Sequence, residues 1–559
     1  MFIDVKNNVF KASVNGTYVD KSELIADLNS LLDNPRRFLL FSRSRRFGKT
    51  YTIRMLNAYY SKRCESKEIF DKLKIADDPT YLENLNKYNV LCLDMQCFAS
   101  SQDKNGHKYL SNLHEKLTQT LVKNFPLAFS GPIKNDFPEA IKQVYDTYNE
   151  QFIVLVDEWD YALRVYQNAD ITKEYVDLLR SLFKDESCAG CFSLVYMTGI
   201  LPIKRYDTES SLNNFKEYTM ESPGKYAKYF GFTEGEVQKL CLEHNLSFEL
   251  AKIWYDGYKL NGIDIYNPNS IMDLIESGEY KSYWCKTGSL DVVTEALKLD
   301  VGNVRQDLVA LLSGAEIKPI NFAKYNSDIK NLKESNDILA YLVHLGYLAY
   351  DNQNNRVYIP NNEVRLAIVD ALKIDNSKLV IEKIKDSESF IKSLLALDEE
   401  KVAAYIEKIH NSNVSILTYN NEVALRYVVM MAMFCADDIY QNALQELQSG
   451  KGFADLVYVP QVQMSAAYPS LVIELKWNKD TQTALDQIKE KQYATALKQT
   501  AKECLLVGIN YDVETKKHSC KIEKIKLDVD FQEFSLLNLT LKKSPRLKNL
   551  GLCCVYYKS

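Results

Sequence analysis

The first two hundred residues of the chain alternate short apolar runs with stretches of helical periodicity. The runs are FLLFS from Phe38, NVLCLDM from Asn89, FIVLVDE from Phe152 and CFSLVYMTG from Cys191. Between them lie stretches such as TIRMLNAYYSK and ITKEYVDLLRSLF, whose apolar residues recur at helical spacing. Strands that are apolar on both faces and separated by helices predict a parallel sheet with helical crossovers. We therefore expect an α/β domain over residues 1–211.

The middle of the chain, residues 212–390, has a mostly helical pattern. One exception is GYLAYDNQNNRVYIPNNEV from Gly346, in which two short strands flank a polar segment at Asp351–Asn355. The order of helix, hairpin and helix is compatible with a winged-helix-like fold, although Asn-rich turn chemistry would explain the hairpin equally well.

The last third, residues 391–559, returns to an α/β pattern. An apolar helix is expected around Glu422–Phe434, followed by strands at GFADLVYV (from Gly452) and SLVIELKW (from Ser470). A polar helix over residues 481–497 and the strand ECLLVGIN from Glu503 come next. The α-β-β-α-β order predicts a second, separate α/β domain.

Composition and charge exclude several classes of protein. Lys and Arg number 69 against 74 Asp and Glu, so the net charge of −5 gives no global positive field, and any nucleic-acid surface must be local. No apolar stretch approaches the roughly 18 residues that cross a bilayer, and MFIDVKNNVFKAS does not resemble a signal peptide. The twelve cysteines are too dilute for a disulfide scaffold. We expect a cytoplasmic protein without a membrane partner.

The first strand leads into RSRRFGKT, where Gly48-Lys49-Thr50 opens a helix. This arrangement is typical of a phosphate loop, in which loop amides face the anion, the lysine reaches the phosphates and the Thr50 hydroxyl ligates Mg²⁺. The complete motif has glycine at position 43, where this chain has Arg43. Arginine is tolerated only if the backbone there keeps a negative φ or the loop turns differently. Arg43, Arg45 and Arg46 either add positive charge at the phosphates or form a solvated loop face.

A pair of acidic residues, Asp157 and Glu158, follows the apolar strand Ile153–Val156. In a parallel sheet, ligands bind outside the carboxyl ends of the strands. Asp157 would hold Mg²⁺ through water, and Glu158 would polarise the attacking water. The alternative is that the pair caps the next helix. Thr198, after the fourth strand, is either a γ-phosphate sensor or merely a polar strand end.

Several motifs occur in an order that resembles a known family. They are YVDKSELI from Tyr18, FLLFSRSRRFGKT, IVLVDEWD, MTGILPI from Met197, FGFTEGEV from Phe230 and WYDGYKLNGIDIYNPNSI from Trp254. The chain is similar to the bacterial AAA-ATPase-like family, whose members often carry a C-terminal PD-(D/E)XK nuclease-like domain and also tolerate loss of the first loop glycine. Ser44 and Trp159 stand where that family usually has proline and tyrosine.

The resemblance implies an ASCE-type P-loop core that binds ATP. The residues expected to contact the nucleotide are Arg45, Arg46, Phe47, Gly48, Lys49, Thr50 and Tyr51, with Asp157 and Glu158 in the acidic-strand role. The block Tyr255-Asp256-Gly257-Tyr258 is a hallmark of the family, for which we expect a packing role.

The third domain contains a second arrangement with catalytic potential. Glu474 and Lys476 are two residues apart on one strand and therefore share a face, and Asp455 lies on the neighbouring strand. Two carboxylates suit Mg²⁺ or Mn²⁺, and the lysine would orient the water or stabilise charge during phosphodiester cleavage. This is the D-x(n)-E-x-K pattern of PD-(D/E)XK nucleases. The alternative is that Glu474 and Lys476 form a surface strand pair.

Neighbouring residues resemble further parts of those nucleases. Gly452 precedes the aspartate, and Gln487 and Tyr493 lie in the helix that follows the lysine strand. Glu422 resembles the additional metal-binding glutamate, with Glu446 as a rival for that position.

The leading hypothesis is an ATP-binding and ATP-hydrolysing switch that controls a Mg²⁺-dependent nuclease domain acting on nucleic acid, DNA in particular. Such a chain could act as a homo-oligomer, and the family resemblance suggests defence or mobile-element biology. The rival hypothesis is a nucleotide-binding regulatory scaffold whose nuclease fold binds nucleic acid or protein without cleavage. Arg43 in place of the loop glycine favours the rival.

Overall fold

A computed structural model describes most of the chain. The described ranges are 6–100, 105–131, 134–166, 168–203, 212–284, 290–299, 301–312, 334–375, 378–412, 422–433, 444–449, 452–461, 467–491 and 501–527, together with positions 3, 103, 317, 322, 332, 435–436, 439–440, 464–465 and 497. Two compact units form from non-contiguous segments. The first comprises residues 1–239, 256–272 and 319–357, and the second comprises residues 240–255, 273–318 and 358–559.

The first unit is built on a five-stranded parallel sheet. Its strands are β1 (Phe38–Ser42), β2 (Asn89–Asp94), β3 (Phe152–Asp157), β4 (Phe192–Gly199) and β5 (Lys216–Tyr218), in the order β2-β3-β4-β1-β5. All neighbouring pairs are parallel. The four strands expected from the apolar runs are confirmed, and β5 is an additional short edge strand. Because β4 lies between β1 and β3, the sheet has the arrangement expected of an ASCE-type core.

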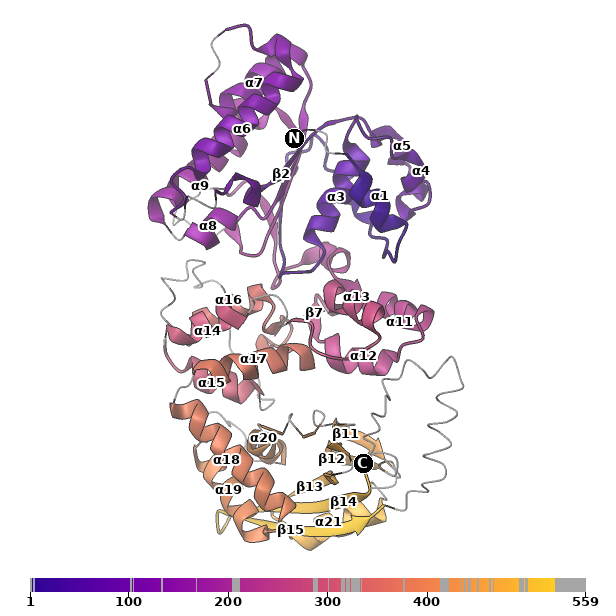
Figure 1. The fold of residues 1–559 in the computed structure, drawn as a ribbon, viewed down its shortest axis with the longest axis vertical. Coiled ribbons are helices and arrows are strands. Elements are labelled where there is room, and N and C mark those ends of the chain that lie inside the picture. Colours follow the sequence, from indigo (N-terminus) through magenta and orange to yellow (C-terminus); the bar gives the residue numbers. More distant parts are fainter. Residues whose placement is uncertain are drawn as a thin grey trace, which may run out of the picture. The chain divides into compact units, whose positions relative to one another are not determined.

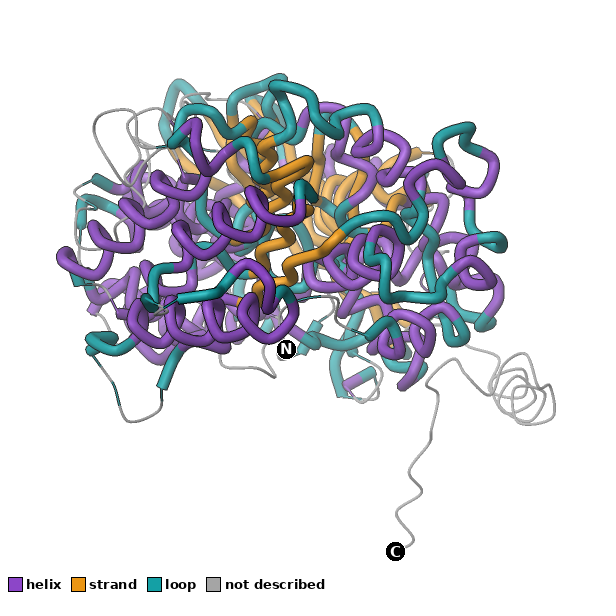
Figure 2. The backbone as a smooth tube through the Cα atoms, turned by 90° about the horizontal axis from the view of Figure 1, so that it is seen from above, coloured by secondary structure: helices purple, strands orange, loops and turns teal. Residues whose placement is uncertain are grey.

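Alternate residues of these strands enter two separate cores. Leu40, Val154 and Met197 pack on one face, whereas Leu39, Leu155 and Tyr196 pack on the other. One face is covered by α6 (Tyr109–Asn124), α7 (Phe137–Tyr148), α8 (Tyr161–Tyr166) and α9 (Ala169–Phe183). The opposite face is covered by α1 (Asn8–Val14), α2 (Glu23–Asn29) and α3 (Lys49–Tyr60). The sheet therefore lies between two helical layers, as predicted (Figures 1 and 2).

Short helices complete the connections of this unit. They are α4 (Lys67–Phe70), η1 (Lys74–Asp77), α5 (Tyr81–Asn84), η2 (Met95–Phe98), η3 (Pro126–Ala128), α10 (Glu186–Ala189) and η5 (Gly224–Tyr229).

The middle of the sequence is less purely helical than expected. β6 (Phe232–Thr233), β7 (Tyr258–Leu260) and β8 (Ile263–Tyr266) form a small antiparallel sheet in the order β6-β8-β7. Helices α11 (Glu234–Glu243) and α12 (Phe248–Tyr255) lie between β6 and β7 in the sequence, and α13 (Pro268–Ser277) follows β8. The predicted hairpin is present as β9 (Ala349–Asp351) and β10 (Arg356–Tyr358), between α16 (Ser335–Leu345) and α17 (Asn362–Asp375). The expected order of helix, hairpin and helix is thus present along the chain, and a winged-helix-like fold for this region stays a prediction.

The Tyr255–Tyr258 block contributes packing next to the phosphate loop. The Tyr258 hydroxyl donates a hydrogen bond to the Gly346 carbonyl oxygen at 2.5 Å. The Tyr258 ring meets the Phe47 ring edge to face, with centroids 5.2 Å apart. This contact places a wholly buried aromatic side chain directly behind the loop.

The second unit contains a five-stranded mixed sheet. Its strands are β11 (Leu444–Ser449), β12 (Gly452–Tyr458), β13 (Ser470–Trp477), β14 (Glu503–Asp512) and β15 (Lys517–Lys526), in sequential order. Only β13 and β14 are parallel, and α21 (Thr481–Glu490) connects them. The predicted elements occur in the predicted α-β-β-α-β order, with β11 as an additional strand between α20 and β12 and with β15 after β14. The part of the predicted helix beyond Lys491 lies largely outside the described residues.

Helices cover both faces of this second sheet as well. Helices α18 (Lys378–Leu395), α19 (Glu399–Ser412) and α20 (Glu422–Ala432) share a core with Leu471, Ile473 and Leu475 of β13. Val472 faces the opposite core with α21. By strand alternation, Glu474 and Lys476 lie on the α21 face. The remaining helices are α14 (Leu290–Lys298) and α15 (Val304–Leu312). No helix within the described ranges is long and apolar enough to cross a bilayer.

A buried histidine pair joins α19 to β15. His410 Nδ1 and His518 Nε2 are 2.9 Å apart, and the Tyr511 ring packs against both. Burial lowers the pKa of His410, and burial with the neighbouring His410 lowers the pKa of His518 to about 4. The folded chain therefore binds a proton at His518 less tightly than the unfolded chain does.

We predict that the free energy of unfolding falls as the pH drops from about 6.5 to about 4. The unfolded state binds more protons than the folded state in this window, so acidification favours unfolding. Moving one histidine pKa from 6.5 to about 4 corresponds to about 3 kcal/mol. Urea unfolding followed by tryptophan fluorescence at several pH values measures the effect. His518→Gln should flatten the dependence and His244→Gln, outside the pair, should not. Equal slopes in all three proteins would contradict the prediction.

Candidate functional site

The loop between β1 and α3 makes its turn without a glycine at position 43. Arg43 is not among the described residues with positive φ, whereas Arg46 has φ 67° and Gly48 has φ 85°. Gly48 has open space where a side chain would project, so its left-handed backbone is what favours glycine there. The loop therefore turns at its end rather than at its start, which leaves position 43 accessible to an ordinary L-residue.

The Arg43 side chain is fully buried and structural. Its Nη1 donates hydrogen bonds of 2.9 Å to the carbonyl oxygens of Ser42 and Tyr218. Its guanidinium lies 4.9 Å above the Phe230 ring. Neither alternative from the sequence is right for Arg43, because it neither faces the phosphate cavity nor forms a solvated surface. It instead ties the loop to β5.

Lys49 is held at the centre of the loop. Its Nζ donates to the carbonyl oxygens of Arg43 at 3.0 Å and Ser44 at 3.1 Å, and lies 3.9 Å from Glu158 Oε1. Burial lowers the pKa of Lys49, and the charge of Glu158 opposes this shift. The ammonium is thus poorly hydrated and already positioned for an anion.

The carboxyl ends of β3 and β4 meet the start of α3 at one edge of the sheet. Asp157 accepts a hydrogen bond from the Thr50 hydroxyl at 2.6 Å and another from the Thr198 hydroxyl at 2.7 Å. The predicted convergence of Thr50 and Asp157 is therefore present. Because the Thr198 hydroxyl donates to Asp157, its position agrees better with holding that carboxylate in place than with sensing the γ-phosphate.

Glu158 is held by a positive partner that the sequence did not assign to it. The Arg164 guanidinium pairs with Glu158 through Nη2 and with Asp160 through Nε, the latter at 2.9 Å. Asp160 is fully buried and also accepts from the backbone amides of Ile200 and Leu201. Burial raises the pKa of Glu158, against the lowering effect of Lys49.

Trp159, the departure from the family pattern, has a packing role. Its Nε1 donates to the Leu201 carbonyl oxygen at 3.3 Å. A Cβ at Gly199 would lie 2.3 Å from Trp159 Cδ1, so the glycine makes room for the indole. The substitution does not alter the acidic pair.

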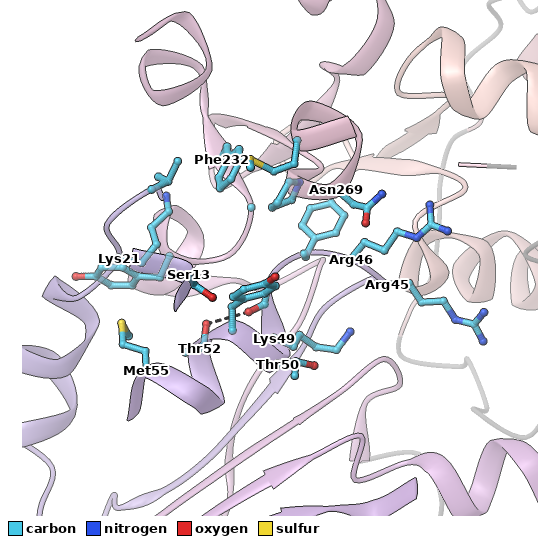
Figure 3. A pocket seen from close by; sticks show the side chains of 18 of the residues that line it. Ser13, Lys21, Arg45, Arg46, Lys49, Thr50, Thr52, Met55, Phe232 and Asn269 are labelled. Atoms are coloured by element: carbon cyan, nitrogen blue, oxygen red, sulfur yellow. Dashed lines mark hydrogen bonds between the residues drawn. The ribbon is translucent and has the colours of Figure 1, made fainter. Parts of the chain in front are cut away.

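A cavity of about 850 Å³ adjoins these residues. This is within the usual size of a small-molecule site. Every residue expected to contact nucleotide lines it: Arg45, Arg46, Phe47, Gly48, Lys49, Thr50 and Tyr51, with Glu158 and Arg164 beside them. Figure 3 shows Arg45, Arg46, Lys49 and Thr50 on one side, and Ser13, Lys21 and Met55 on the other. Phe232 and Met272 add further apolar surface. The loop side of the cavity is thus cationic, and Met55, Phe232 and Met272 supply apolar surface elsewhere in its lining, a combination that suits a nucleotide.

The second unit brings together the acid and lysine pattern around β13. Lys476 Nζ donates to Glu474 Oε1 at 2.9 Å and to Gln487 Oε1 at 2.8 Å, and Gln487 Nε2 donates to the same Glu474 oxygen. Asp455 Oδ2 accepts from the Leu475 amide at 2.8 Å. Asp455 and Glu474 therefore lie on adjacent strands with the lysine oriented by the glutamine.

Burial excludes the surface-pair alternative for these residues. Glu474 is 2% exposed and Lys476 is 6% exposed. Burial, followed by the charge of Asp455, raises the pKa of Glu474 to about 7. Glu474 Oε2 is buried with no hydrogen-bond partner within the described part of the chain. A buried carboxylate oxygen requires a partner, and a divalent cation fits this donor set.

Other expected residues of this site are placed only in part. Glu422 begins α20, Glu446 lies in β11 and Gly452 begins β12, but the side chains of the two glutamates are outside the described ones. Tyr493 is outside the described residues altogether. Arg426, which the sequence analysis missed, donates from Nη2 to Asp455 Oδ1 at 3.1 Å. The sequence feature that could have indicated Arg426 is its position four residues after Glu422, one helical turn along the same predicted helix.

A third acidic cluster lies in the first unit. Glu234, Asp256 and Asp264 have carboxylate oxygens within 4.8 Å of one another. Asp256 comes from the hallmark Tyr255–Tyr258 block, so that block supplies a charge as well as the packing of Tyr258.

The first unit has the features of a P-loop ATPase, and the second has those of a PD-(D/E)XK nuclease fold. Comparison with known proteins agrees: residues 9–208 match the family model of predicted AAA-ATPases, and residues 423–520 match that of the PD-(D/E)XK nuclease superfamily. The chain therefore contains an AAA-ATPase-like domain and a PD-(D/E)XK nuclease superfamily domain, and the predicted architecture is confirmed.

Individual relatives support the assignment less than the two family models do. An uncharacterized protein in the vnfD 5′ region of Azotobacter chroococcum mcd 1 is 30% identical over 169 residues, which are 28% of this chain and 32% of that protein. The chain thus matches about a third of that relative's length. The structure of the Aeropyrum pernix ORC2 protein (ADPNP-ADP complexes) is 12% identical with a TM-score of 0.30, covering 66% of this chain and 98% of that chain. At this TM-score the likeness adds nothing to the assignment.

We predict that restoring the motif glycine with Arg43→Gly destabilises the protein and leaves ATP affinity no better. The variant loses two hydrogen bonds from a buried cation and its contact with Phe230, for a cost of about 2–4 kcal/mol. Denaturant unfolding and calorimetric titration with ATP measure the two effects. Arg45→Gly is the matched control, because Arg45 lines the cavity: it should weaken ATP binding with a smaller loss of stability. Tighter ATP binding by Arg43→Gly at unchanged stability would contradict the structural role of Arg43.

Proposed function

We propose that this protein is an ATP-hydrolysing switch whose C-terminal domain cleaves nucleic acid, DNA in particular. The observation that carries the proposal is the convergence of Lys49, Thr50 and Asp157 at one edge of a parallel sheet, beside a cavity with a cationic side. The family matches support ATPase and nuclease-like domains. The specific reactions, ions and substrates are our proposal.

In the first site, Lys49 binds the β- and γ-phosphates and the loop amides complete the cradle. Thr50 and Asp157 are the residues that would hold Mg²⁺, which would neutralise charge developing on the phosphates. Glu158 accepts the proton of the attacking water. Arg45 and Arg46 contribute positive charge from the loop.

In the second site, Asp455 and Glu474 would hold Mg²⁺ or Mn²⁺, with Glu422 as a third ligand. The bound cation would polarise the phosphodiester. Lys476 orients the attacking water, and Gln487 keeps the ammonium in place through its 2.8 Å contact. Glu474 Oε2, which has no hydrogen-bond partner in the described part of this unit, supports a cation at this position.

The wider assignments also remain proposals. We propose the domain division 1–211, 212–390 and 391–559, with nucleotide state in the first domain controlling cleavage in the third. The described cysteines are free thiols, which supports a cytoplasmic location. A role in bacterial defence or mobile-element biology, and assembly as a homo-oligomer, rest on the family resemblance.

A second candidate function is a nucleotide-binding scaffold that turns over ATP poorly. The observation that favours it is the ion pair between Arg164 and Glu158, which occupies the proposed base. Arg43 no longer favours the scaffold, because its side chain lies away from the cavity. Calorimetric ATP binding without phosphate release, together with no DNA nicking in Mn²⁺, would support this candidate.

For the first site, we predict that Glu158→Gln retains ATP binding but slows hydrolysis by about 10²-fold or more, because the amide cannot accept the proton. Lys49→Ala should lose ATP binding itself. Calorimetry and phosphate release measure the two steps. Tyr51→Phe, which keeps the ring at the exposed edge of the cavity, serves as control. Hydrolysis by Glu158→Gln at the wild-type rate would exclude Glu158 as the base.

For the second site, we predict that Lys476→Ala abolishes nicking of supercoiled DNA in Mn²⁺, because the buried ammonium is lost from beside Glu474. Lys479→Ala is the matched control, since Lys479 is exposed beyond the end of the same strand. If the two domains are coupled as proposed, Lys49→Ala should also reduce nicking. Nicking by Lys476→Ala equal to that of the control would overturn the catalytic assignment.

A further inference from the structure

Arg426 lies in α20 and contacts an acid of the proposed nuclease site. Its Nη2 is 3.1 Å from Asp455 Oδ1, and the side chains of Arg426 and Asp455 are 16% and 21% exposed. The second oxygen, Asp455 Oδ2, accepts from the Leu475 amide. Both oxygens of Asp455 therefore already have a partner: a guanidinium at Oδ1 and a backbone amide at Oδ2.

Glu474 differs from Asp455 in this respect. Lys476 and Gln487 both donate to Oε1, while Oε2 has no hydrogen-bond partner within the described residues. A cation can approach Glu474 through its second oxygen without displacing Lys476. At Asp455, by contrast, it must share Oδ1 with the Arg426 guanidinium or Oδ2 with the Leu475 amide, and either oxygen lies close to the guanidinium charge.

The guanidinium and a divalent cation oppose each other at Asp455. A cation bound to Oδ1 would lie within roughly 5 Å of the Arg426 charge, where like charges repel strongly in a half-buried site. Arginine does not lose its proton in proteins, so deprotonation cannot relieve the repulsion. Relief requires that the guanidinium move to another anion.

A nucleic-acid backbone supplies such an anion at the same place. Guanidinium groups bind phosphate oxygens with two parallel hydrogen bonds, a geometry that favours phosphate over a single contact to a carboxylate. A phosphodiester positioned for cleavage must approach Asp455 and Glu474, and it therefore comes within reach of Arg426.

We propose that Arg426 couples cation binding to nucleic-acid binding: its guanidinium competes with the divalent cation for Asp455 until a phosphodiester takes the guanidinium over. This inference rests on the proposed nuclease function and adds a positioning residue to it. By linkage, nucleic acid strengthens cation binding and the cation strengthens nucleic-acid binding by the same factor.

A purely structural role for Arg426 gives a different result. If the ion pair only fastens α20 to β12, its removal lowers the melting temperature and leaves the cation affinity unchanged or weaker. The coupling role requires that removal of the guanidinium strengthen cation binding.

The experiment is a calorimetric titration of the full chain with Mn²⁺, with and without a phosphorothioate DNA duplex that resists cleavage. Arg426→Gln should bind Mn²⁺ more tightly than wild type without DNA, by a factor on the order of tenfold. Addition of DNA should tighten binding by wild type and have a smaller effect on Arg426→Gln. Arg426→Lys, which keeps the charge, should remain closer to wild type.

Two controls separate failure of the inference from failure of the proposed function. Glu474→Gln should lose the Mn²⁺ binding in question, and if it does not, the metal site itself is wrong. If Glu474→Gln loses binding while Arg426→Gln binds as wild type or more weakly, the coupling alone is overturned. Should Arg426→Gln not fold, the wild-type titrations decide: Mn²⁺ affinity unchanged by DNA contradicts the coupling.

Discussion

Parallel strand pairing is the constraint on which the first site depends. Because β1, β3 and β4 run in the same direction, their carboxyl ends lie at one edge of the sheet. This brings Asp157 against Thr198 and the Thr50 hydroxyl. The two-sided apolar character of the strands buries that edge between helical layers, so the charged groups that reach it are poorly hydrated and must find partners.

Both sites meet this requirement in the same way. Three of the acids have a cationic partner from their own unit: Glu158 has Arg164, Glu474 has Lys476 and Asp455 has Arg426. Asp157 is held instead by the hydroxyl groups of Thr50 and Thr198. Such pairs offset the cost of removing charges from water, and they hold the acids in defined positions. At Glu158 and Asp455 the cationic partner also competes with the proton or cation that the acid is proposed to bind. At Glu474 it does not, because Lys476 contacts Oε1 and Oε2 has no hydrogen-bond partner among the described residues.

Much of the fold follows from local pattern. The strands Phe38–Ser42, Phe152–Asp157 and Ser470–Trp477 were predictable because continuous apolar runs have few other stable structures. β5 was not, because three partly exposed residues, Lys216–Tyr218, carry no apolar run and form a strand only where β1 offers an edge. The same holds for β15, whose alternating polar residues depend on pairing with β14. The small sheet of β6, β7 and β8 consists of strands too short to show a period.

The sequence by itself determined which two domain types the chain contains, because Gly48-Lys49-Thr50, Asp157-Glu158 and the Asp455, Glu474 and Lys476 pattern are recognised from residue type and spacing along a strand or loop. Tertiary structure decided what the arginines do. Arg43 is buried against the Phe230 ring, Arg164 is paired with Glu158 and Arg426 is paired with Asp455. The reason is that a guanidinium sits at the end of a long flexible side chain, so its partner depends on which distant anion or ring the fold brings within reach.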